Sequence, residues 1–462
     1  MSTPNTNTPS NPPITVAIIG NGVIGSALAL GLHKRNIRVK VYEQAQTLRS
    51  IGAGIAFTKN ARECLALIDP RLDACVTAVG TVNGDPRDPN NNMQFVDGYT
   101  HDPVEHCLPN EEMVGRFVFK LFAGERGFEG CHRAQFLEGV MEVMPEEVVC
   151  LGRRLERYCL PGEGENQSDK IKLVFGDGGV DEADIVIGCD GIKSRVRQLL
   201  YGRDNPISHP HYTHKVAYRG LVPMNLAISH LGSYRALNQH MYGGPNAHVL
   251  HFPVADQKLM NVVAFVNDLD DWPLDKGMTQ PASKDEIAAA FVDWGPTVKG
   301  VIELLLRSKE MDKWGVFDMY EYPAPRYAEG RVCIAGDAAH ASAPHHGAGA
   351  GIGVEDALAL CVVLERAQRE IDSGYRGKVD ALGFALKTFS DVRYERSQWL
   401  VRSSREVCET YEWVNPECGK DMAKGFEDVK ARSHQIWYFD IEGMVKDLQR
   451  AFDMVPAEDL VL

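Results

Sequence analysis

Three glycines near the N-terminus have the spacing of a loop that binds a diphosphate. They are Gly20, Gly22 and Gly25, within the stretch Gly-Asn-Gly-Val-Ile-Gly. In such a loop the first glycine permits a tight turn, the second lets the backbone approach the diphosphate, and the third lets a helix pack closely on a strand. The N–H groups and the positive dipole end of that helix then face the anion. The spacing therefore predicts a cradle for the diphosphate of a dinucleotide.

A carboxylate further along the chain narrows the choice of dinucleotide. Glu43 ends the stretch Ile-Arg-Val-Lys-Val-Tyr-Glu, which has the alternation of a strand. At this place a carboxylate can accept hydrogen bonds from ribose hydroxyls. Its negative charge also repels a 2′-phosphate, so NADP is disfavoured at this site. The first motif by itself leaves FAD and NAD as alternatives.

Two later pairs of glycine and aspartate each follow an apolar stretch. Asp190-Gly191 precedes a helical segment that carries Ser194 and Arg197. Gly336-Asp337 precedes a second glycine-rich loop, which opens a helix, so its N–H groups can hydrogen-bond another electronegative surface. That loop follows Pro344 and contains Gly347, Gly349, Ala350 and Gly351.

The segments around these motifs have the periodicities of strands and helices. Ile14–Ile19 is typical of a strand buried on both faces, and Ser26–Arg35 is typical of a helix. Segments within residues 201–324 alternate apolar and polar residues, as in an antiparallel sheet with one covered face. Ala357–Arg369 and Val379–Glu406 have the apolar spacing of helices. This order predicts an α/β fold with an antiparallel sheet between its motifs.

Composition and charge argue against several other classes of protein. The net charge of -14 argues against a general nucleic-acid or anionic-membrane surface. Glycines interrupt the apolar run Val16–Ala29, and no basic residue precedes it, so it resembles neither a membrane span nor a signal peptide. Residues 1–13 are polar and proline-rich, which is typical of a disordered leader. We therefore expect a cytoplasmic protein with no membrane span and no nucleic-acid partner.

Cysteines and histidines give no pattern of metal ligands along the chain. The 11 cysteines are scattered without a Cys-x-x-Cys pair, as is typical of reduced, buried thiols. His345-His346 and the group His209, His211 and His214 have no cysteine or carboxylate partner at ligand spacing. The sequence therefore predicts no bound metal.

In their order and residues, the three motifs resemble those of the single-component (class A) FAD-dependent aromatic hydroxylases, the para-hydroxybenzoate and salicylate hydroxylase class. The resemblance implies that the first motif holds the ADP half of FAD. The second then lies near FAD and the path of NAD(P)H, and the third places Asp337 at the ribityl and pyrophosphate. Arg133 matches an arginine that opens a helix beside the cofactor. The implied cofactor-binding residues are Gly20, Gly22, Gly25, Glu43, Gly54, Arg133, Asp190, Gly336, Asp337, Gly347, Gly349, Ala350 and Gly351.

Nearly the whole chain is similar to fungal enzymes that hydroxylate and dearomatise resorcinol-type aldehydes and ketones on polyketide pathways to tropolones, azaphilones and sorbicillinoids. Stretches such as Ala-Tyr-Arg-Gly-Leu and Leu-His-Phe-Pro-Val carry the similarity. It implies that Arg219 binds the substrate phenolate and that Arg219 and Pro344 are catalytic. Phe252 stands where some members have a substrate-holding tyrosine, and Tyr242 is a candidate to supply the missing phenol. Arg219, Phe252 and Tyr242 are the implied substrate-binding residues.

The resemblance also implies a fold class and domain boundaries. The expected fold is α/β, with a Rossmann-like FAD-binding domain, an inserted antiparallel-sheet substrate domain and C-terminal helices. The expected boundaries are a disordered leader (1–13), a discontinuous FAD-binding domain (14–75, 116–200 and 325–370), a substrate-binding sheet domain (76–115 and 201–324) and a C-terminal helical region (371–462).

The implied activity is hydroxylation of an electron-rich phenol. NADPH or NADH reduces FAD, O2 adds to give an electrophilic flavin C4a-hydroperoxide, and the phenolate attacks it. Attack at a methyl-bearing carbon gives a dearomatised dienone, whereas attack at an unsubstituted or carboxylate-bearing carbon gives a catechol. The expected partners are a small phenolic substrate and O2, and the expected state is a monomer or homodimer. The alternatives are a decarboxylating salicylate-type hydroxylase or another FAD oxidoreductase and, more remotely, an NAD-dependent dehydrogenase or a non-catalytic flavin-binding protein.

Overall fold

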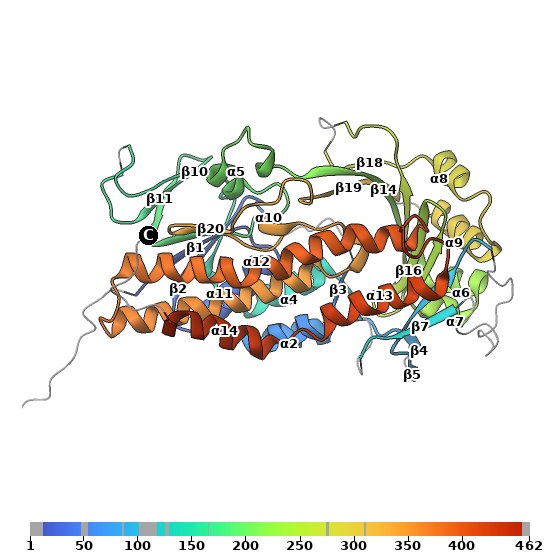
Figure 1. The fold of residues 1–462 in the computed structure, drawn as a ribbon, viewed down its shortest axis with the longest axis horizontal. Coiled ribbons are helices and arrows are strands. Elements are labelled where there is room, and N and C mark those ends of the chain that lie inside the picture. The colour runs from blue at the N-terminus through green and yellow to red at the C-terminus, as the bar shows by residue number, and fades with distance from the viewer. Residues whose placement is uncertain are drawn as a thin grey trace, which may run out of the picture.

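The computed structural model describes most of the chain. The described residues are 13–47, 54–85, 87–100, 118–124, 129–164, 166–273, 277–308 and 311–454. The predicted leader lies outside these ranges except for Pro13, and so do residues 101–115 of the predicted substrate segment. Figure 1 shows two main layers at opposite ends of a long molecule, joined by the long helix α12 (Lys378–Tyr411), which contacts β20 of one layer and β15 of the other.

One layer is a six-stranded, mostly parallel sheet. Its strand order is β20-β21-β13-β1-β2-β9, and only β20 pairs antiparallel. The central strands β1 and β13 are apolar and almost fully buried, as in a parallel sheet covered on both faces. The strands are β20 (Ala328–Glu329), β21 (Val332–Ile334), β13 (Ile185–Gly188), β1 (Thr15–Ile19), β2 (Arg38–Glu43) and β9 (Val149–Leu151).

Helices cover this sheet and extend beyond it. The first helix, α1, begins directly after the second glycine of the first motif, and α11 begins within the second glycine-rich loop. α11 packs against α1, α2, α12 and α14. The helices of this layer are α1 (Val23–Lys34), α2 (Lys59–Ile68), α3 (Pro70–Val79), α4 (Arg133–Val143), α5 (Arg195–Tyr201), α10 (Asp337–His340), α11 (Gly349–Asp372), α12 (Lys378–Tyr411), α13 (Met422–Trp437) and α14 (Ile441–Met454).

The other layer is an eight-stranded sheet with the order β18-β19-β14-β17-β16-β15-β6-β7. Its pairs are antiparallel except for β15 with β6. Helices α6 (Met224–Leu231), α7 (Ser233–Leu237), α8 (Lys284–Ala290) and α9 (Pro296–Leu306) lie on this side of the molecule. The strands are β6 (Asn92–Asp97), β7 (Val118–Phe122), β14 (His211–Pro223), β15 (His240–Gly244), β16 (Ala247–Val254), β17 (Leu259–Asn267), β18 (Thr279–Pro281) and β19 (Met311–Asp318).

The α/β fold class and the inserted antiparallel sheet are confirmed. One segment lies elsewhere than its expected domain: β7 falls within 116–200, yet it pairs with β6 in the eight-stranded sheet, with Phe119 opposite Phe95. Smaller elements complete the fold: β3 (Gly54–Phe57) with β8 (Glu129–His132), β4 (Gly84–Asp85) with β5 (Asp88–Pro89), the sheet β10 (Leu155–Cys159), β11 (Ile171–Phe175) and β12 (Val180–Ala183), and the 3-10 turns η1 (Glu146–Val148), η2 (Pro206–Ser208) and η4 (Pro344–His346).

Within the described ranges, no helix is both long enough and apolar enough to cross a bilayer.

Candidate active site

The three glycine motifs meet at one edge of the six-stranded sheet. Strands β21, β13 and β1 are parallel neighbours in that order. The third, second and first motifs follow these strands directly, and Glu43 ends β2, the next neighbour. Because the carboxyl ends of parallel strands share an edge, motifs far apart in sequence line one crevice, where α/β sheets bind their ligands.

The first loop can be built only with glycine at two of its positions. Gly20 has φ of +100°, and a Cβ there would lie 2.5 Å from the carbonyl oxygen of Cys189. A Cβ on Gly25 would lie 2.0 Å from the carbonyl oxygen of Gly20, so α1 rests directly on the turn. Gly22 is sterically less constrained, since its nearest neighbour would be a guanidinium nitrogen of Arg133 at 3.4 Å. The N-terminus of α1 therefore opens beside Arg133.

Glu43 is oriented by the loop that it faces. Its Oε2 accepts a hydrogen bond from the backbone N–H of Asn21 at 2.9 Å, and its Oε1 accepts one from that of Ala45 at 2.8 Å. Each carboxylate oxygen keeps a further lone pair for a ribose hydroxyl. The position is the one that the sequence predicts for a ribose-binding carboxylate.

Asp337 lies on the wall of a recess. Its side chain is exposed to solvent, yet burial among the surrounding protein raises its pKa, an effect that the charges of His340 and Arg133 partly offset. A side chain that solvent reaches but that has protein on most sides is placed as expected for a residue lining a crevice. Arg133, also exposed, therefore faces both Asp337 and the first loop, and the structure brings these three sequence-predicted elements together.

Asp190 lies at the same edge of the sheet, but its carboxylate is hydrogen-bonded to residues of its own loop and helix. Its carboxylate accepts hydrogen bonds from Ser194 Oγ at 2.5 Å and from the N–H groups of Arg195 at 2.6 Å and Val196 at 3.1 Å. Burial raises the pKa of Asp190, and these donors counteract the rise. Asp190 thus caps the start of α5 beside the crevice.

Arg197, on the same helix, connects the second motif to the third. Its side chain is fully buried, and Nη1 donates to the carbonyl oxygens of Ala338 at 3.1 Å and Ala339 at 2.8 Å. Its Nε donates to Ile207 O at 2.5 Å. α5 is therefore fastened to α10, the helix that begins with Asp337, and the separation of the two motifs is fixed.

The loop after Pro344 presents bare backbone beside Asp337. Gly347 has φ of +62°, and a Cβ there would meet nothing within 4 Å among the described residues. A Cβ on Gly349 would lie 4.0 Å from Asp337 Oδ1. Ala350 is half-buried in the first turn of α11. Gly351 differs from the expectation, because it is buried against Ala61 of α2 and so serves the packing of α11.

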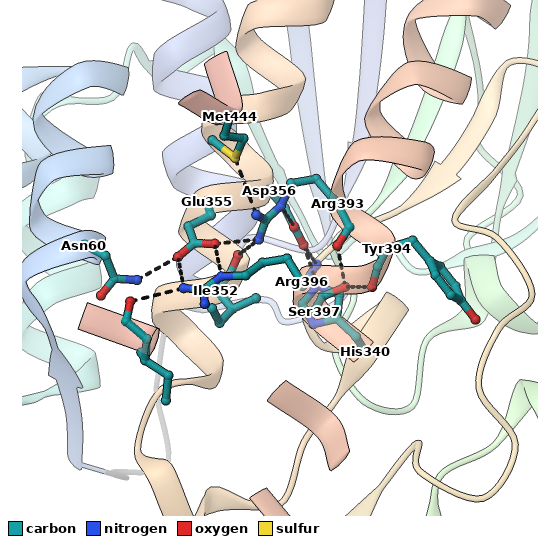
Figure 2. A network of polar contacts seen from close by, with 12 residues as sticks. Asn60, His340, Ile352, Glu355, Asp356, Arg393, Tyr394, Arg396, Ser397 and Met444 are labelled. Atoms are coloured by element: carbon teal, nitrogen blue, oxygen red, sulfur yellow. Dashed lines mark hydrogen bonds and ion pairs between the residues drawn. The ribbon is translucent and has the colours of Figure 1, made fainter. Parts of the chain in front are cut away.

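A buried network of charges supports the third motif from behind, as Figure 2 shows. Asp356 Oδ2 accepts from the N–H of Gly336 at 3.0 Å and lies 2.5 Å from His340 Nε2, while Oδ1 accepts from Arg393 Nε at 2.9 Å. Burial alone would raise the pKa of Asp356, but His340 and Arg393 hold it at about 2. Arg393 also pairs with Glu355 at 2.8 Å.

No local pattern in the sequence predicts this network. Its acidic residues follow the glycine-rich loop directly on α11, but the partner arginine arrives from α12. Glu355 in turn binds Arg396 Nη2 at 3.0 Å and Asn60 Nδ2 at 2.7 Å. These contacts join α2, α11 and α12 beneath the third motif. Because Asp356 accepts from the N–H of Gly336, the network orients Gly336 and hence Asp337.

Arg219 lies on the face of the eight-stranded sheet against which Ala343, the residue before Pro344, packs. Side chains on a strand alternate between faces, so Arg219 shares a face with Ala217, which packs in one cluster with Phe265 and Ala343. Its guanidinium lies 4.7 Å from the ring centroid of Trp314. Burial lowers the pKa of Arg219, and Asp312 partly offsets this. The buried Nε has no hydrogen-bond partner within the described part of the chain.

Phe252 lies on the same face as Arg219. Val263 pairs with both Arg219 and Leu250, and Phe252 is two residues beyond Leu250 on β16. A Cβ on Gly54 would lie 3.7 Å from the Phe252 ring, and one on Gly130 would lie 3.1 Å from it. Gly54 therefore approaches the eight-stranded sheet, and Phe252 bridges this sheet to β3 and β8.

Tyr242 is on the opposite face, which corrects its expected place in the substrate site. It is one residue beyond Met241, whose partner Leu250 belongs to the Arg219 face. Tyr242 is fully buried with Tyr218 and Ala264 in the cluster beneath the helices, and its hydroxyl lies 3.3 Å from His251 Nε2. The sheet thus separates Tyr242 from Arg219, so we leave it out of the proposed site.

Known proteins with the same sequence features and fold define the class. Residues 165–374 match the family model described as FAD binding domain. The FAD-dependent monooxygenase pigN of Monascus ruber is 48% identical, over 95% of this chain and 97% of its own. The salicylate hydroxylase asL1 of Sarocladium schorii is 42% identical, over 96% and 92%. A solved salicylate hydroxylase substrate complex is 30% identical, with a TM-score of 0.78, covering 94% of this chain and 98% of that one.

The crevice and the sheet facing it thus define an FAD-binding oxidoreductase. The chain belongs to the FAD-dependent monooxygenases of the class A, salicylate hydroxylase-like family, whose members hydroxylate aromatic substrates.

Proposed function

We propose that this enzyme uses NADPH or NADH and O2 to hydroxylate an electron-rich phenol, a resorcinol aldehyde or ketone of a polyketide pathway, with dearomatisation. The observation that carries the proposal is Arg219, a half-buried cation on the face shared with Ala343, whose buried Nε has no hydrogen-bond partner among the described residues. A permanently charged planar donor fits a phenolate with a neighbouring carbonyl oxygen.

The residues of the crevice fit FAD. The loop Gly20–Gly25 and the N-terminus of α1 suit its diphosphate, and Glu43 suits a ribose. Asp337 and Arg133 suit the middle of the cofactor, and Gly347 leaves space where a side chain would obstruct a ring. When bound, FAD supplies the reductive activation of O2, which no side chain can perform.

The role proposed for Arg219 is electrostatic. A phenol reacts at its ortho and para carbons once it is ionised, because the negative charge adds electron density to the ring. In a buried site, a fixed cation stabilises that charge far more than it would in water. The ring of Trp314 supports the guanidinium from one side and leaves the rest of its donors for the substrate.

Phe252 and the Pro344 loop are proposed to shape the pocket. Phe252 offers an apolar wall in place of a hydroxyl, which excludes water that would compete for the activated oxygen. Pro344 keeps the loop backbone close to the flavin position, and its half-buried ring carries no polar group. The pose against these surfaces decides which carbon reacts, and dearomatisation follows where that carbon carries a methyl group.

A panel of substrates tests the proposal. We expect the purified protein to be yellow, and resorcinol aldehydes to accelerate its consumption of NAD(P)H and O2 and to give products with one added oxygen atom. Acceleration by none of the phenols, or a protein that cannot be loaded with FAD, would overturn it.

A decarboxylating salicylate-type activity is the second candidate, favoured by the similarity to asL1 and to the solved salicylate hydroxylase. It predicts that salicylates are turned over in preference and that the carboxyl group is replaced by hydroxyl. Product masses from the same panel distinguish the two.

A further inference from the structure

Three buried side chains with metal-binding atoms meet behind the Pro344 loop. They are His248 on β16, His345 on η4 and Cys408 on α12, and their ligand atoms all lie within 4.8 Å of one another. The sequence predicts no metal because His345-His346 has no cysteine or carboxylate partner at ligand spacing. The fold brings Cys408 to these histidines from α12, a helix far along the chain from both of them.

A carboxylate fixes the orientation of His248. Its Nδ1–H donates to Glu412 Oε1 at 3.0 Å, and Lys215 contacts the other oxygen of Glu412. With the proton on Nδ1, the lone pair is on Nε2, which is buried and has no hydrogen-bond partner within the described ranges. A carboxylate behind a histidine is the usual arrangement behind a metal-binding imidazole.

His345 and Cys408 complete the set. His345 Nδ1 is also buried without a hydrogen-bond partner among the described residues, and two such orphaned nitrogens side by side are costly. Their rings lie 5.2 Å apart between centroids. The Cys408 thiol donates to Glu412 Oε1 at 3.3 Å, so its sulfur is held beside the same carboxylate.

We propose that His248 Nε2, His345 Nδ1 and the Cys408 thiolate bind a cation of the Zn²⁺ class. Two imidazoles and one thiolate are a ligand set that Zn²⁺ prefers over Mg²⁺ or Ca²⁺. Binding forms the metal–sulfur bond as the thiol proton leaves to water, and Glu412 balances the added charge. Tetrahedral ligands of Zn²⁺ lie roughly 3.3–3.7 Å apart, so rotation of the side chains closes the present separations.

A cation bound at this place would hold the loop that contains Pro344. His345 follows Pro344 directly, while His248 belongs to the substrate sheet and Cys408 to α12. A bound cation fixes all three elements relative to one another, and the Pro344 loop loses freedom. The site itself does not rest on the identity of the substrate, because its evidence is the placement of these three side chains alone.

Zinc binding by the FAD-loaded enzyme tests the proposal. After chelator treatment that leaves FAD bound, we expect the wild type to take up one equivalent of Zn²⁺ and to retain it through dialysis. Cys408→Ser and His345→Gln are expected to lose it. Cys361→Ser is the matched control, a buried thiol of α11 that packs near Gly31. Equal zinc content in the wild type and in both ligand variants, or no uptake by the wild type, would overturn the proposal.

Two further measurements cover the case in which a ligand variant does not fold. Glu412→Gln leaves all three ligands in place and is expected to weaken Zn²⁺ binding by about 10–100-fold. Zinc X-ray absorption of the wild type is expected to show one sulfur and two imidazole nitrogens at the metal. A shell of oxygen and nitrogen alone would assign the ion to another place.

Discussion

At the scale of single residues, the most informative side chain is Arg219, whose buried Nε has no hydrogen-bond partner among the described residues. Among the described residues, Asp312 is the opposite charge that acts on Arg219, and the guanidinium rests on the ring of Trp314 without an ion pair there. A donor that is buried without an acceptor costs about 1–3 kcal/mol. The phenolate of the proposed substrate would give this donor its acceptor.

Replacing this cation tests its role. We expect Arg219→Gln to lower kcat/KM for the phenol by about 10²–10³-fold, the effect of removing one preorganised donor from a developing charge, with FAD binding unchanged. Substrate-dependent NAD(P)H consumption measures it. Lys313→Gln is the control, a cation of the same sheet whose partner, Glu286, lies 3.5 Å away. Equal turnover in the wild type and Arg219→Gln would remove the assignment.

At the scale of elements, the site depends on neighbouring parallel strands. The motifs that follow β21, β13 and β1 were predictable because each glycine has a local task that the sequence shows. The face of Tyr242 was not, since a shift of one residue in pairing moves every side chain of a strand to the other face. Arg393 was missed for a similar reason: its burial depends on how α12 packs against α11, which no local pattern shows.

The two kinds of glycine in the first loop should respond differently to a methyl group. Gly25→Ala puts a Cβ against backbone at 2.0 Å, so we expect it to prevent folding or FAD binding altogether. Gly22→Ala meets only the flexible end of Arg133 at 3.4 Å, so the apoprotein folds normally while FAD binds more weakly. Circular dichroism and FAD titration measure these effects. Wild-type affinity in Gly22→Ala would contradict the diphosphate assignment.

Removal of the central arginine of the network in Figure 2 should destabilise the protein strongly. Arg393→Met leaves Glu355 and Asp356 buried without their shared cation, so we expect a loss of about 3–5 kcal/mol in the free energy of unfolding. Lys387→Met is the control, because it removes an exposed pair with Asp391 on the same helix and should cost less than about 1 kcal/mol. Denaturant titrations compare the two, and similar losses would contradict the prediction.

At the scale of the whole molecule, buried histidines make stability depend on pH. Burial lowers the pKa of His240 to about 4 and that of His251 well below its usual range. The unfolded chain binds protons at these histidines near pH 6.5, whereas the folded chain does not. Acidification below that pH therefore favours unfolding.

We expect the free energy of unfolding to fall by about 1.4 kcal/mol per pH unit for each such histidine between pH 6.5 and its folded pKa. His240→Gln removes one of them, so its stability should fall less steeply with acid than that of the wild type. Urea titrations at several pH values provide the slopes. Parallel slopes in the two proteins would show that His240 is not held neutral by the fold.

α12 joins the two layers with 34 residues that contain one glycine and no proline. It contacts β20 of the parallel sheet, η4 and β15 of the antiparallel sheet. Such a helix is stiff, because sharp kinks arise at proline or at glycine–serine pairs. It therefore acts as a strut: the two layers cannot swing apart about a hinge without breaking it, so the edge that carries the glycine motifs and the face that carries Arg219 keep one separation.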